Sequence, residues 1–281
     1  MNKAFDLAGR AALVTGGGRG IGRACALSLA AAGADVAVID LDSTIGEELA
    51  AEIRKLGRRS SFFPCDVASP DQVDAAIDGV ANLFGRLDVA VNNAGVWRRG
   101  ADETQAPADW DAVVSVNLTG VWLCAMAEMK LMRKNRPAEG KIINIASVGS
   151  FIYAGNGAYD ASKAGVVQLS RSLAAQWGRY NINVNCISPG YVGNVFGRSR
   201  SEEERQRLRE ITPLGYVQRT ADLCGPVVFL ASSASDYVTG HNLVVDGGHS
   251  LSTWLRPLER DLPPRVDPAG ELDDIPVVAG Y

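Results

Sequence analysis

The sequence offers few groups that could bind a metal ion or cross-link the chain. Only two histidines, His241 and His249, occur in 281 residues, and their spacing does not match a ligand set, so no metal site is expected. The five cysteines are widely spaced and form no Cys-x-x-Cys pair. This pattern indicates reduced, mostly buried thiols in a cytoplasmic protein.

The sequence also has no excess of positive charge and no long apolar run. Its 28 lysines and arginines against 32 acids give a net charge of −4, which favours neither nucleic acid nor an anionic membrane surface as a partner. We expect no membrane helix, which needs about 18 apolar residues, and the first ten residues do not resemble a signal peptide. The hydrophobic share of 47% is typical of a globular protein.

Short apolar runs alternate with longer segments of helical spacing along most of the chain. The runs are rich in Val and Ile, as in strands that are buried on both faces. We therefore expect an α/β fold: a single Rossmann-type, doubly wound parallel sheet of about seven strands with helices on both faces, in one domain over residues 1–248. The expected strands are 11–15, 36–39, 61–64, 89–91, 142–145, 184–187 and 243–245, and the expected helices are 21–32, 43–56, 71–84, 109–133, 157–180 and 221–231.

Two regions break this alternation. Residues 188–213 are expected to hold no strand, only a short solvated helix in the charged stretch SEEERQRLRE, on a long loop typical of a lid. Residues 249–281 contain five of the 12 prolines and show no helical or strand period. We expect them to form a C-terminal arm that packs on its own or a neighbouring subunit through Trp254, Leu255 and Leu258, the alternative being an unanchored chain end.

A glycine-rich turn follows the first expected strand and precedes an Ala-rich helix. Gly16, Gly20 and Gly22 have the spacing G-x-x-x-G-x-G. In dinucleotide-binding turns such glycines permit a tight turn, a close approach to the pyrophosphate and close packing of helix on strand. The helix N-terminus then offers free N–H groups to the phosphates. Glycine clusters also form plain turns, but the strand before and the helix after favour phosphate binding.

Asp40 and Arg19 favour different cofactors. Asp40 ends the second expected strand, about 20 residues past the turn, where an acid can accept hydrogen bonds from the adenosine ribose and repel a 2′-phosphate. The Arg19 guanidinium can pair with that phosphate, or can simply be solvated. We expect NAD, with NADP as the less favoured cofactor.

Tyr159 and Lys163 lie four residues apart, which places them on one face of a helix. Free tyrosine has a pKa near 10, and a nearby ammonium favours the phenolate. Such a tyrosine can take a proton from an alcohol or return it to a ketone. Ser147 follows a strand, where its hydroxyl can bind the reacting oxygen. Asn117 interrupts a long apolar helix, and its alternative role is a capping or kink-stabilising amide.

Together these motifs resemble the short-chain dehydrogenase/reductase family over about residues 5–248. The glycine spacing resembles its subfamily of shorter, simple oxidoreductases. Stretches such as NNAGVWRR and GKIINIAS look most like the sugar-alcohol and sugar-acid dehydrogenases of the family. The residues that carry the resemblance are TGGGRGIG (15–22), Asp66-Val67, NNAG (92–95), Asn117, Ser147, YDASK (159–163), Pro189-Gly190 and DGG (246–248).

The resemblance implies reversible hydride transfer between a secondary alcohol and a nicotinamide cofactor, without metal, in a homodimer or, more typically, a homotetramer. It implies that Tyr159 is the general acid/base, that Lys163 lowers its pKa, that Ser147 binds the substrate oxygen and that Asn117 holds a water. Asn194 stands where the family commonly has Thr, which puts that cofactor contact in doubt. The implied cofactor-binding residues are Gly16, Arg19, Gly20, Ile21, Gly22, Asp40, Asp66, Val67, Asn93, Gly95, Lys163, Pro189, Gly190 and Asn194.

The expected substrate pocket mixes aromatic and polar residues, which suits a polyhydroxylated small molecule. The residues expected to line it are Trp97, Gly149, Tyr153 and Tyr191, with Val96, Arg98, Asn156 and Phe196 nearby. Arg98 and Arg99 can bind a carboxylate or can be solvated loop residues. We expect a polyol or sugar-acid dehydrogenase. The alternatives are a reductase of 3-oxoacyl groups or small ketones, and a non-catalytic dinucleotide-binding sensor.

Overall fold

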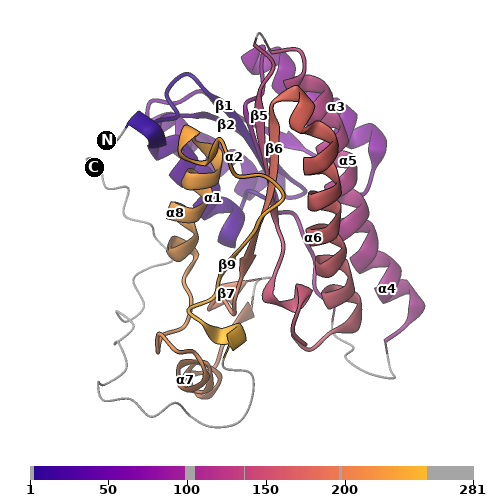
Figure 1. The fold of residues 1–281 in the computed structure, drawn as a ribbon, viewed down its shortest axis with the longest axis vertical. Coiled ribbons are helices and arrows are strands. Elements are labelled where there is room, and N and C mark those ends of the chain that lie inside the picture. The colour runs from indigo at the N-terminus through magenta and orange to yellow at the C-terminus, as the bar shows by residue number, and fades with distance from the viewer. Residues whose placement is uncertain (1–2, 99–104, 136, 196–197, 252–281) are drawn as a thin grey trace.

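The computed structural model describes residues 3–98, 105–135, 137–195 and 198–251. Its centre is a seven-stranded, entirely parallel sheet with the strand order β3-β2-β1-β4-β5-β6-β9 (Figure 1). The expected doubly wound α/β sheet is confirmed. The strands are β1 Ala11–Thr15, β2 Asp35–Asp40, β3 Ser60–Pro64, β4 Val89–Asn92, β5 Gly140–Ile145, β6 Ile182–Pro189 and β9 Asn242–Val245.

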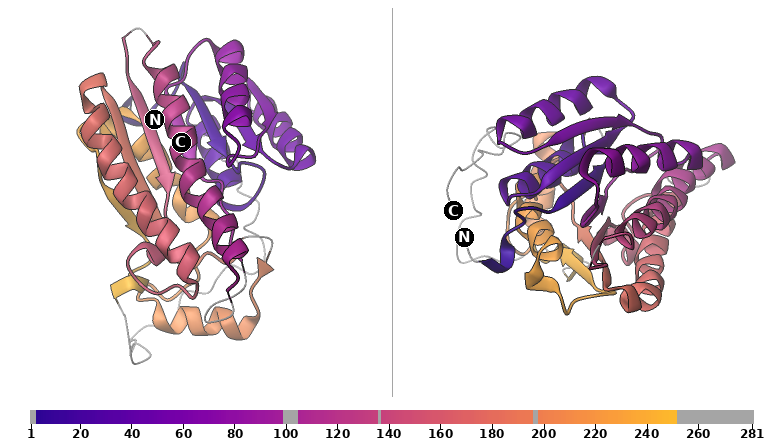
Figure 2. Two further views of the ribbon diagram at one scale, coloured as in Figure 1. Left: turned by 90° about the vertical axis from the view of Figure 1, so that its right-hand side faces the viewer. Right: turned by 90° about the horizontal axis from the view of Figure 1, so that it is seen from above.

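Helices cover both faces of the sheet, as Figure 2 shows. One apolar layer joins α1 Gly20–Ala31, α2 Ser43–Lys55 and α8 Cys224–Ala231 to the sheet. The opposite layer joins α3 Pro70–Phe84, α5 Val121–Met132 and α6 Gly157–Trp177. Because both faces are covered, central strands such as β1 are buried along their whole length, which explains their continuous apolar sequences.

The expected helix 109–133 is a rod of three parts. It begins with α4 Pro107–Val114, continues through a π-helical turn at Ser115–Gly120 and ends as α5. By length and composition this rod is long and apolar enough to cross a membrane, although polar residues such as Asn117 interrupt it. Half of its most apolar 18-residue stretch is buried inside the protein. The α5 part packs on α3, β4 and β5, as a core helix does.

The expectation that residues 188–213 hold no strand is wrong. β6 extends to Pro189, and Asn194–Val195 (β7) pairs antiparallel with Arg198–Ser199 (β8). Two-residue strands carry too little apolar periodicity to be recognised in a sequence. The expected charged helix is present as α7 Glu202–Ile211, which begins with a capping box between Ser201 and Glu204.

The predicted C-terminal arm lies outside the described residues, apart from one 3₁₀ turn at His249–Leu251. Phe196 and Arg99 also lie outside them, as does the side chain of Asn194. The strand order reverses between β1 and β4, and in open parallel sheets ligands bind at the carboxyl ends of the strands beside such a point. The predicted site residues follow the carboxyl ends of β1 to β6 or lie on α6 and in the π-helical turn.

Candidate active site

The glycine-rich turn between β1 and α1 has the geometry of an anion site. Gly16 and Gly20 have φ of +60° and +55°, which favour glycine. A Cβ on Gly22 would collide with the carbonyl oxygen of Gly16. Arg19 is the N-cap of α1 but makes no side-chain cap, so the first N–H groups of the helix stay available to an anion. These features fit the pyrophosphate of a dinucleotide.

Asn93 braces this turn from the end of β4. Its Nδ2 donates to the carbonyl oxygens of Thr15 (3.1 Å) and Gly16 (2.9 Å). The Thr15 hydroxyl in return accepts from the backbone N–H groups of Asn93 and Ala94, both at 3.1 Å. The sequence analysis named Asn93 as a lining residue and included Thr15 in the glycine-rich motif without a role of its own, because that role depends on the pairing of β1 with β4.

Asp40 lies directly beside the turn, at the end of β2. Its Oδ2 accepts from the Gly18 N–H (2.9 Å) and its Oδ1 from the Asp42 N–H (3.2 Å). The carboxylate is therefore fixed next to the glycine-rich backbone. Arg19, the residue after Gly18, is exposed to solvent.

Two further predicted motifs shape the loops around the same edge. The Asp66 carboxylate accepts from the Ala68 N–H (2.9 Å). Val67 is buried against Gly120 of the π-helical turn, where an added Cβ would lie 2.8 Å from the Val67 side chain. Gly190 donates its N–H to Gln218 Oε1 (2.7 Å), and a Cβ there would lie 2.9 Å from Asp246. The Pro-Gly and Asp-Gly-Gly motifs, 56 residues apart in the numbering, therefore meet in space.

Tyr159 and Lys163 project from the first turns of α6. Asn156 caps this helix by accepting from the Tyr159 N–H (2.9 Å), and it donates to the Arg98 carbonyl oxygen (2.8 Å). Asn156 is fully buried, so it is a helix cap rather than a pocket surface. The Lys163 ammonium donates to the Ile145 carbonyl oxygen (2.8 Å) and lies 5.8 Å from the centre of the Tyr159 ring.

Asn117 is buried in the π-helical turn and bonded at both ends of its amide. Its Oδ1 accepts from the Val96 N–H (2.8 Å), and its Nδ2 donates to the Val96 carbonyl oxygen (3.0 Å) and to Ser162 Oγ (3.3 Å). A Cβ on Gly95 would lie 3.3 Å from Asn117 Oδ1 and 3.7 Å from Lys163 Nζ, so these residues adjoin. Asn117 therefore ties the Val96 loop to the π-helical turn and caps neither end of it, and the water-holding role stays a prediction.

Burial controls the ionisation of the central pair. It raises the pKa of the Tyr159 phenol to about 12. The charge of Asp160 also raises this pKa, whereas the hydrogen bond with Ser147 lowers it. Burial lowers the pKa of the Lys163 ammonium to about 8. Ser147 also accepts from the Gly149 N–H (3.1 Å), which fixes its hydroxyl beside the tyrosine. The lowering of the Tyr159 pKa by Lys163 stays a prediction.

The predicted substrate side carries more groups than the sequence revealed. Tyr153 is 75% exposed, Trp97 is half-buried, and Gly149 leaves room for the Asp160 carboxylate. The Tyr191 ring stacks edge-on against His249 at 4.9 Å, and the Arg200 guanidinium lies 5.5 Å from the ring centre. No local pattern links Tyr191 to His249, because they are joined only through the fold.

The sequence is similar to a family model and to several proteins of known activity. A family model described as Enoyl-(Acyl carrier protein) reductase matches residues 16–250. The chain is 40% identical over 259 residues to the 2-dehydro-3-deoxy-D-gluconate 5-dehydrogenase of Escherichia coli (strain K12), covering 90% of this chain and 98% of the relative.

Two further relatives support the same placement. The D-threitol dehydrogenase of Mycolicibacterium smegmatis (strain ATCC 700084 / mc(2)155) is 39% identical over 249 residues, covering 88% of this chain and 95% of the relative. The crystal structure of a gluconate 5-dehydrogenase from Burkholderia cenocepacia J2315, in complex with NADP and tartrate, aligns with a TM-score of 0.84 at 40% identity. That alignment covers 89% of this chain and 98% of the other.

Proposed function

The chain belongs to the short-chain dehydrogenase/reductase family, and from that premise we propose that it oxidises a secondary hydroxyl of a sugar alcohol or sugar acid, reversibly, with NAD. It is an oxidoreductase that acts on CH–OH groups with a nicotinamide cofactor. The observation that carries the proposal is the juxtaposition of Tyr159, Ser147 and Lys163 beside the anion-binding turn.

The proposed roles follow from the contacts of each residue. When bound, the nicotinamide accepts or donates the hydride. Ser147 holds the substrate oxygen, and Tyr159 Oη takes its proton as general base or returns it as general acid. Lys163, fixed by the Ile145 carbonyl, adds positive charge near the phenol and binds the cofactor ribose. Asn117 holds the loop that carries Gly95 and Val96 against the site.

The proposed substrate class rests on the pocket and on the relatives. Trp97, Tyr153 and Tyr191 offer aromatic faces with polar tips, which suit polyhydroxylated chains. Two relatives are named for a sugar acid and a polyol. A 3-oxoacyl or small-ketone reductase is the second candidate, favoured by a relative that is named as a 3-oxoacyl-[acyl-carrier-protein] reductase. A non-catalytic sensor is disfavoured because Asn117, Ser147, Tyr159 and Lys163 are all present.

A panel of sugar alcohols, sugar acids and simple secondary alcohols, with NAD or NADP at about pH 7.5 and again at about pH 9 to 10, tests the proposal, because high pH favours the oxidative direction. Formation of reduced cofactor with one polyol or sugar acid is the expected result. Activity only on a simple alcohol, or only in the reverse assay with a 3-oxoacyl ester, would overturn the carbohydrate assignment and leave the family assignment standing.

We expect Asp40→Asn to shift the cofactor preference towards NADP. The amide keeps one acceptor for the Gly18 N–H but removes the negative charge that would repel a 2′-phosphate. The ratio of kcat/KM for NAD to that for NADP should fall by about 10- to 100-fold, which corresponds to roughly 1–3 kcal/mol. Asp42→Asn, at the exposed cap of α2, is the control and should leave the ratio unchanged. An unchanged ratio in Asp40→Asn would show that Asp40 only braces the turn.

We also propose a cytoplasmic homo-oligomer, a tetramer in preference to a dimer, in which the arm 249–281 contributes to packing. Trp122 on α5 is 45% exposed, as expected of a surface that a second subunit covers. Leu214 and Leu251 are also exposed, and Leu214 lines a hollow of about 570 Å³ between α7 and the end of β9. Sedimentation should give the mass of a tetramer for the full chain and a lower mass or weaker association after truncation at Leu251. A monomeric full chain would contradict the proposal.

A further inference from the structure

A row of buried polar side chains crosses the sheet just before the residues that build the active site. Thr15, Asn92, Asn144 and Cys186 are register partners on β1, β4, β5 and β6, and partners in a parallel sheet point to the same face. Asn92 Nδ2 donates to Asn144 Oδ1 (3.0 Å). Asn144 Nδ2 donates to Ser170 Oγ on α6 (2.7 Å), which also accepts from Cys186 Sγ (3.0 Å). All of these groups are buried.

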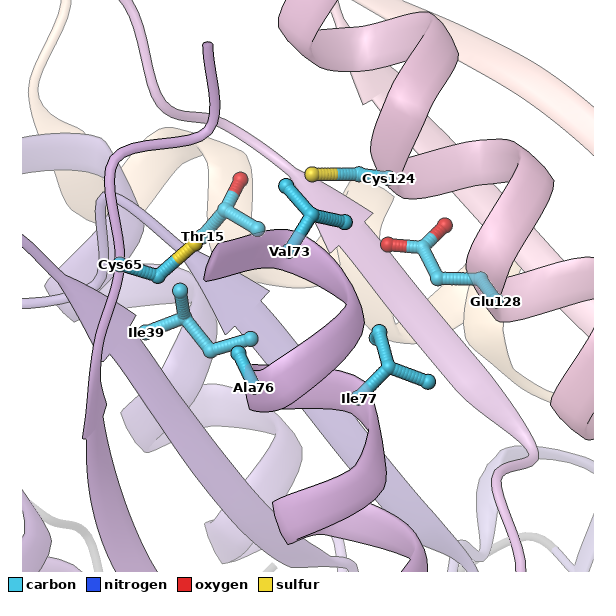
Figure 3. A pocket seen from close by; sticks show the side chains of 8 residues that line it. All are labelled: Thr15, Ile39, Cys65, Val73, Ala76, Ile77, Cys124 and Glu128. Carbon is cyan, nitrogen blue, oxygen red and sulfur yellow. The ribbon is translucent and has the colours of Figure 1, made fainter. Parts of the chain in front are cut away.

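The row ends on a buried acid, Glu128 of α5. Asn92 Nδ2 donates to Glu128 Oε2 at 3.1 Å, while Glu128 Oε1 is buried without a hydrogen-bond partner. Figure 3 shows the carboxylate extending from α5 toward the apolar side chains of α3. The space there leaves no room for a water molecule. Its lining residues are Thr15, Ile39, Cys65, Val73, Ala76, Ile77, Cys124 and Glu128.

Among the residues that the structure describes, no cation lies beside Glu128 to compensate a negative charge. The titratable groups that face it are two thiols, Cys124 of its own helix and Cys65 from the end of β3, and the side chains from α3, β1 and β2 that line the space are uncharged. Burial raises the pKa of Glu128 to about 8, with only the Asn92 hydrogen bond acting against it. The acid is therefore neutral at pH 7 and becomes charged in the alkaline range.

The polar row lies next to the residues that build the site. Asn92 precedes Asn93, which braces the glycine-rich turn, and Asn144 precedes Ile145, whose carbonyl oxygen holds Lys163. At its far end Cys186 lies close enough to Lys163 for each to influence the charge of the other. A charge on Glu128 must draw in water or displace α5, because one N–H donor cannot solvate a carboxylate. Either change disturbs the ends of β4 and β5.

We propose that Glu128 is a positioning residue that must be protonated for the site to hold its geometry, and that its ionisation sets the alkaline limit of the enzyme. The proposal rests on the proposed oxidoreductase function for its readout in turnover. Through Asn92 and Asn144, neutral Glu128 keeps Asn93 and Ile145 in place. Ionised Glu128 weakens cofactor binding at the turn and the hold on Lys163.

The test compares the wild type with Glu128→Gln over about pH 6 to 10.5. In the direction of ketone reduction, where protonated Tyr159 is the acid, the expected wild-type kcat/KM falls about tenfold per pH unit above a transition near the pKa of about 8. In Glu128→Gln this fall disappears or moves up by at least one pH unit, while kcat/KM below about pH 7 is unchanged. Glu48→Gln, at an exposed position on α2, is the matched control and should behave as the wild type.

If the fall of kcat/KM at alkaline pH were unchanged in Glu128→Gln, the proposal would be overturned. The fall would then be assigned to Lys163, whose pKa is also about 8. A uniform loss at every pH would also overturn it, because that result indicates a merely structural residue. If Glu128→Gln does not fold, Glu128→Met serves in its place. A failure of the proposed function leaves the proposal testable, since the same shift must appear in the pH dependence of reduced-cofactor binding, which needs no substrate.

The unfolding temperature gives an independent readout. The pKa of Glu128 is raised above its ordinary value of 4.5, so its contribution to stability is complete below about pH 4.5 and is lost as the pH rises to about 8. The difference in unfolding temperature between Glu128→Gln and the wild type should therefore increase in favour of the variant from pH 6 to pH 9. A difference that is independent of pH would contradict a buried, titrating Glu128.

Discussion

Replacement of Tyr159 by Phe is expected to reduce kcat by about 10²–10⁴-fold, the range that a positioned general acid/base contributes. The variant removes one oxygen atom and leaves the ring, so the packing on Lys163 and the cap from Asn156 to the Tyr159 N–H should remain. The affinity for the cofactor should stay within about twofold. Steady-state kinetics and a fluorescence titration with reduced cofactor measure the two quantities separately.

Tyr153→Phe is the matched control, since Tyr153 is exposed at the mouth of the proposed pocket and has no role in proton transfer. It should change KM for the substrate more than kcat. If Tyr159→Phe kept more than a tenth of the turnover, the proposed proton transfer by Tyr159 would be wrong. If it lost cofactor binding together with turnover, Tyr159 would be a structural residue.

Many of the elements that build the site could be predicted from local sequence. Buried strands such as β1 are continuous apolar runs, and the glycine-rich turn has a fixed spacing because each glycine answers a separate steric demand. Tyr159 and Lys163 could be paired because a helix brings residues four apart onto one face. In each case the physical cause acts within a few residues, and so it is visible in the sequence.

The parts that could not be predicted depend on contacts between distant segments. The π-helical turn at Ser115–Gly120 has the composition of an ordinary helix, and Asn117 within it is bonded to the backbone of Val96, 21 residues earlier. The brace from Asn93 to Thr15 depends on the register between β4 and β1. Sequence periodicity reports which residues are buried, but it does not report which buried polar groups find each other.

Glu128 illustrates this limit most clearly. In the sequence it is one acid on a long helix, where acids are normally solvated. In the structure the sheet places Asn92 opposite it and α3 covers it, so an ordinary surface residue type becomes a buried titrating group. Buried polar residues of this kind carry information about function because the fold tolerates their cost at particular places.

Replacement of Gly22 by Ala is expected to weaken cofactor binding by at least about 100-fold, equivalent to roughly 3 kcal/mol. The new Cβ would collide with the Gly16 carbonyl oxygen and come within 2.5 Å of Asn93 Nδ2. Both groups are fixed, since Asn93 Nδ2 donates to the Gly16 carbonyl oxygen at 2.9 Å. The helix must move away from the turn, and this separates the N–H groups of α1 from the phosphates they would bind.

The same collision should destabilise the fold by about 1–3 kcal/mol, the usual cost of forcing an extra methyl group into a packed site. Gly225→Ala is the matched control, because Gly225 lies in α8 with open space at its Cβ position and the substitution should be neutral or slightly stabilising. Titration with reduced cofactor and thermal unfolding measure both effects. If Gly22→Ala bound the cofactor like the wild type, the turn at residues 16–22 would not be the phosphate site, since no phosphate can approach α1 once the helix has been displaced.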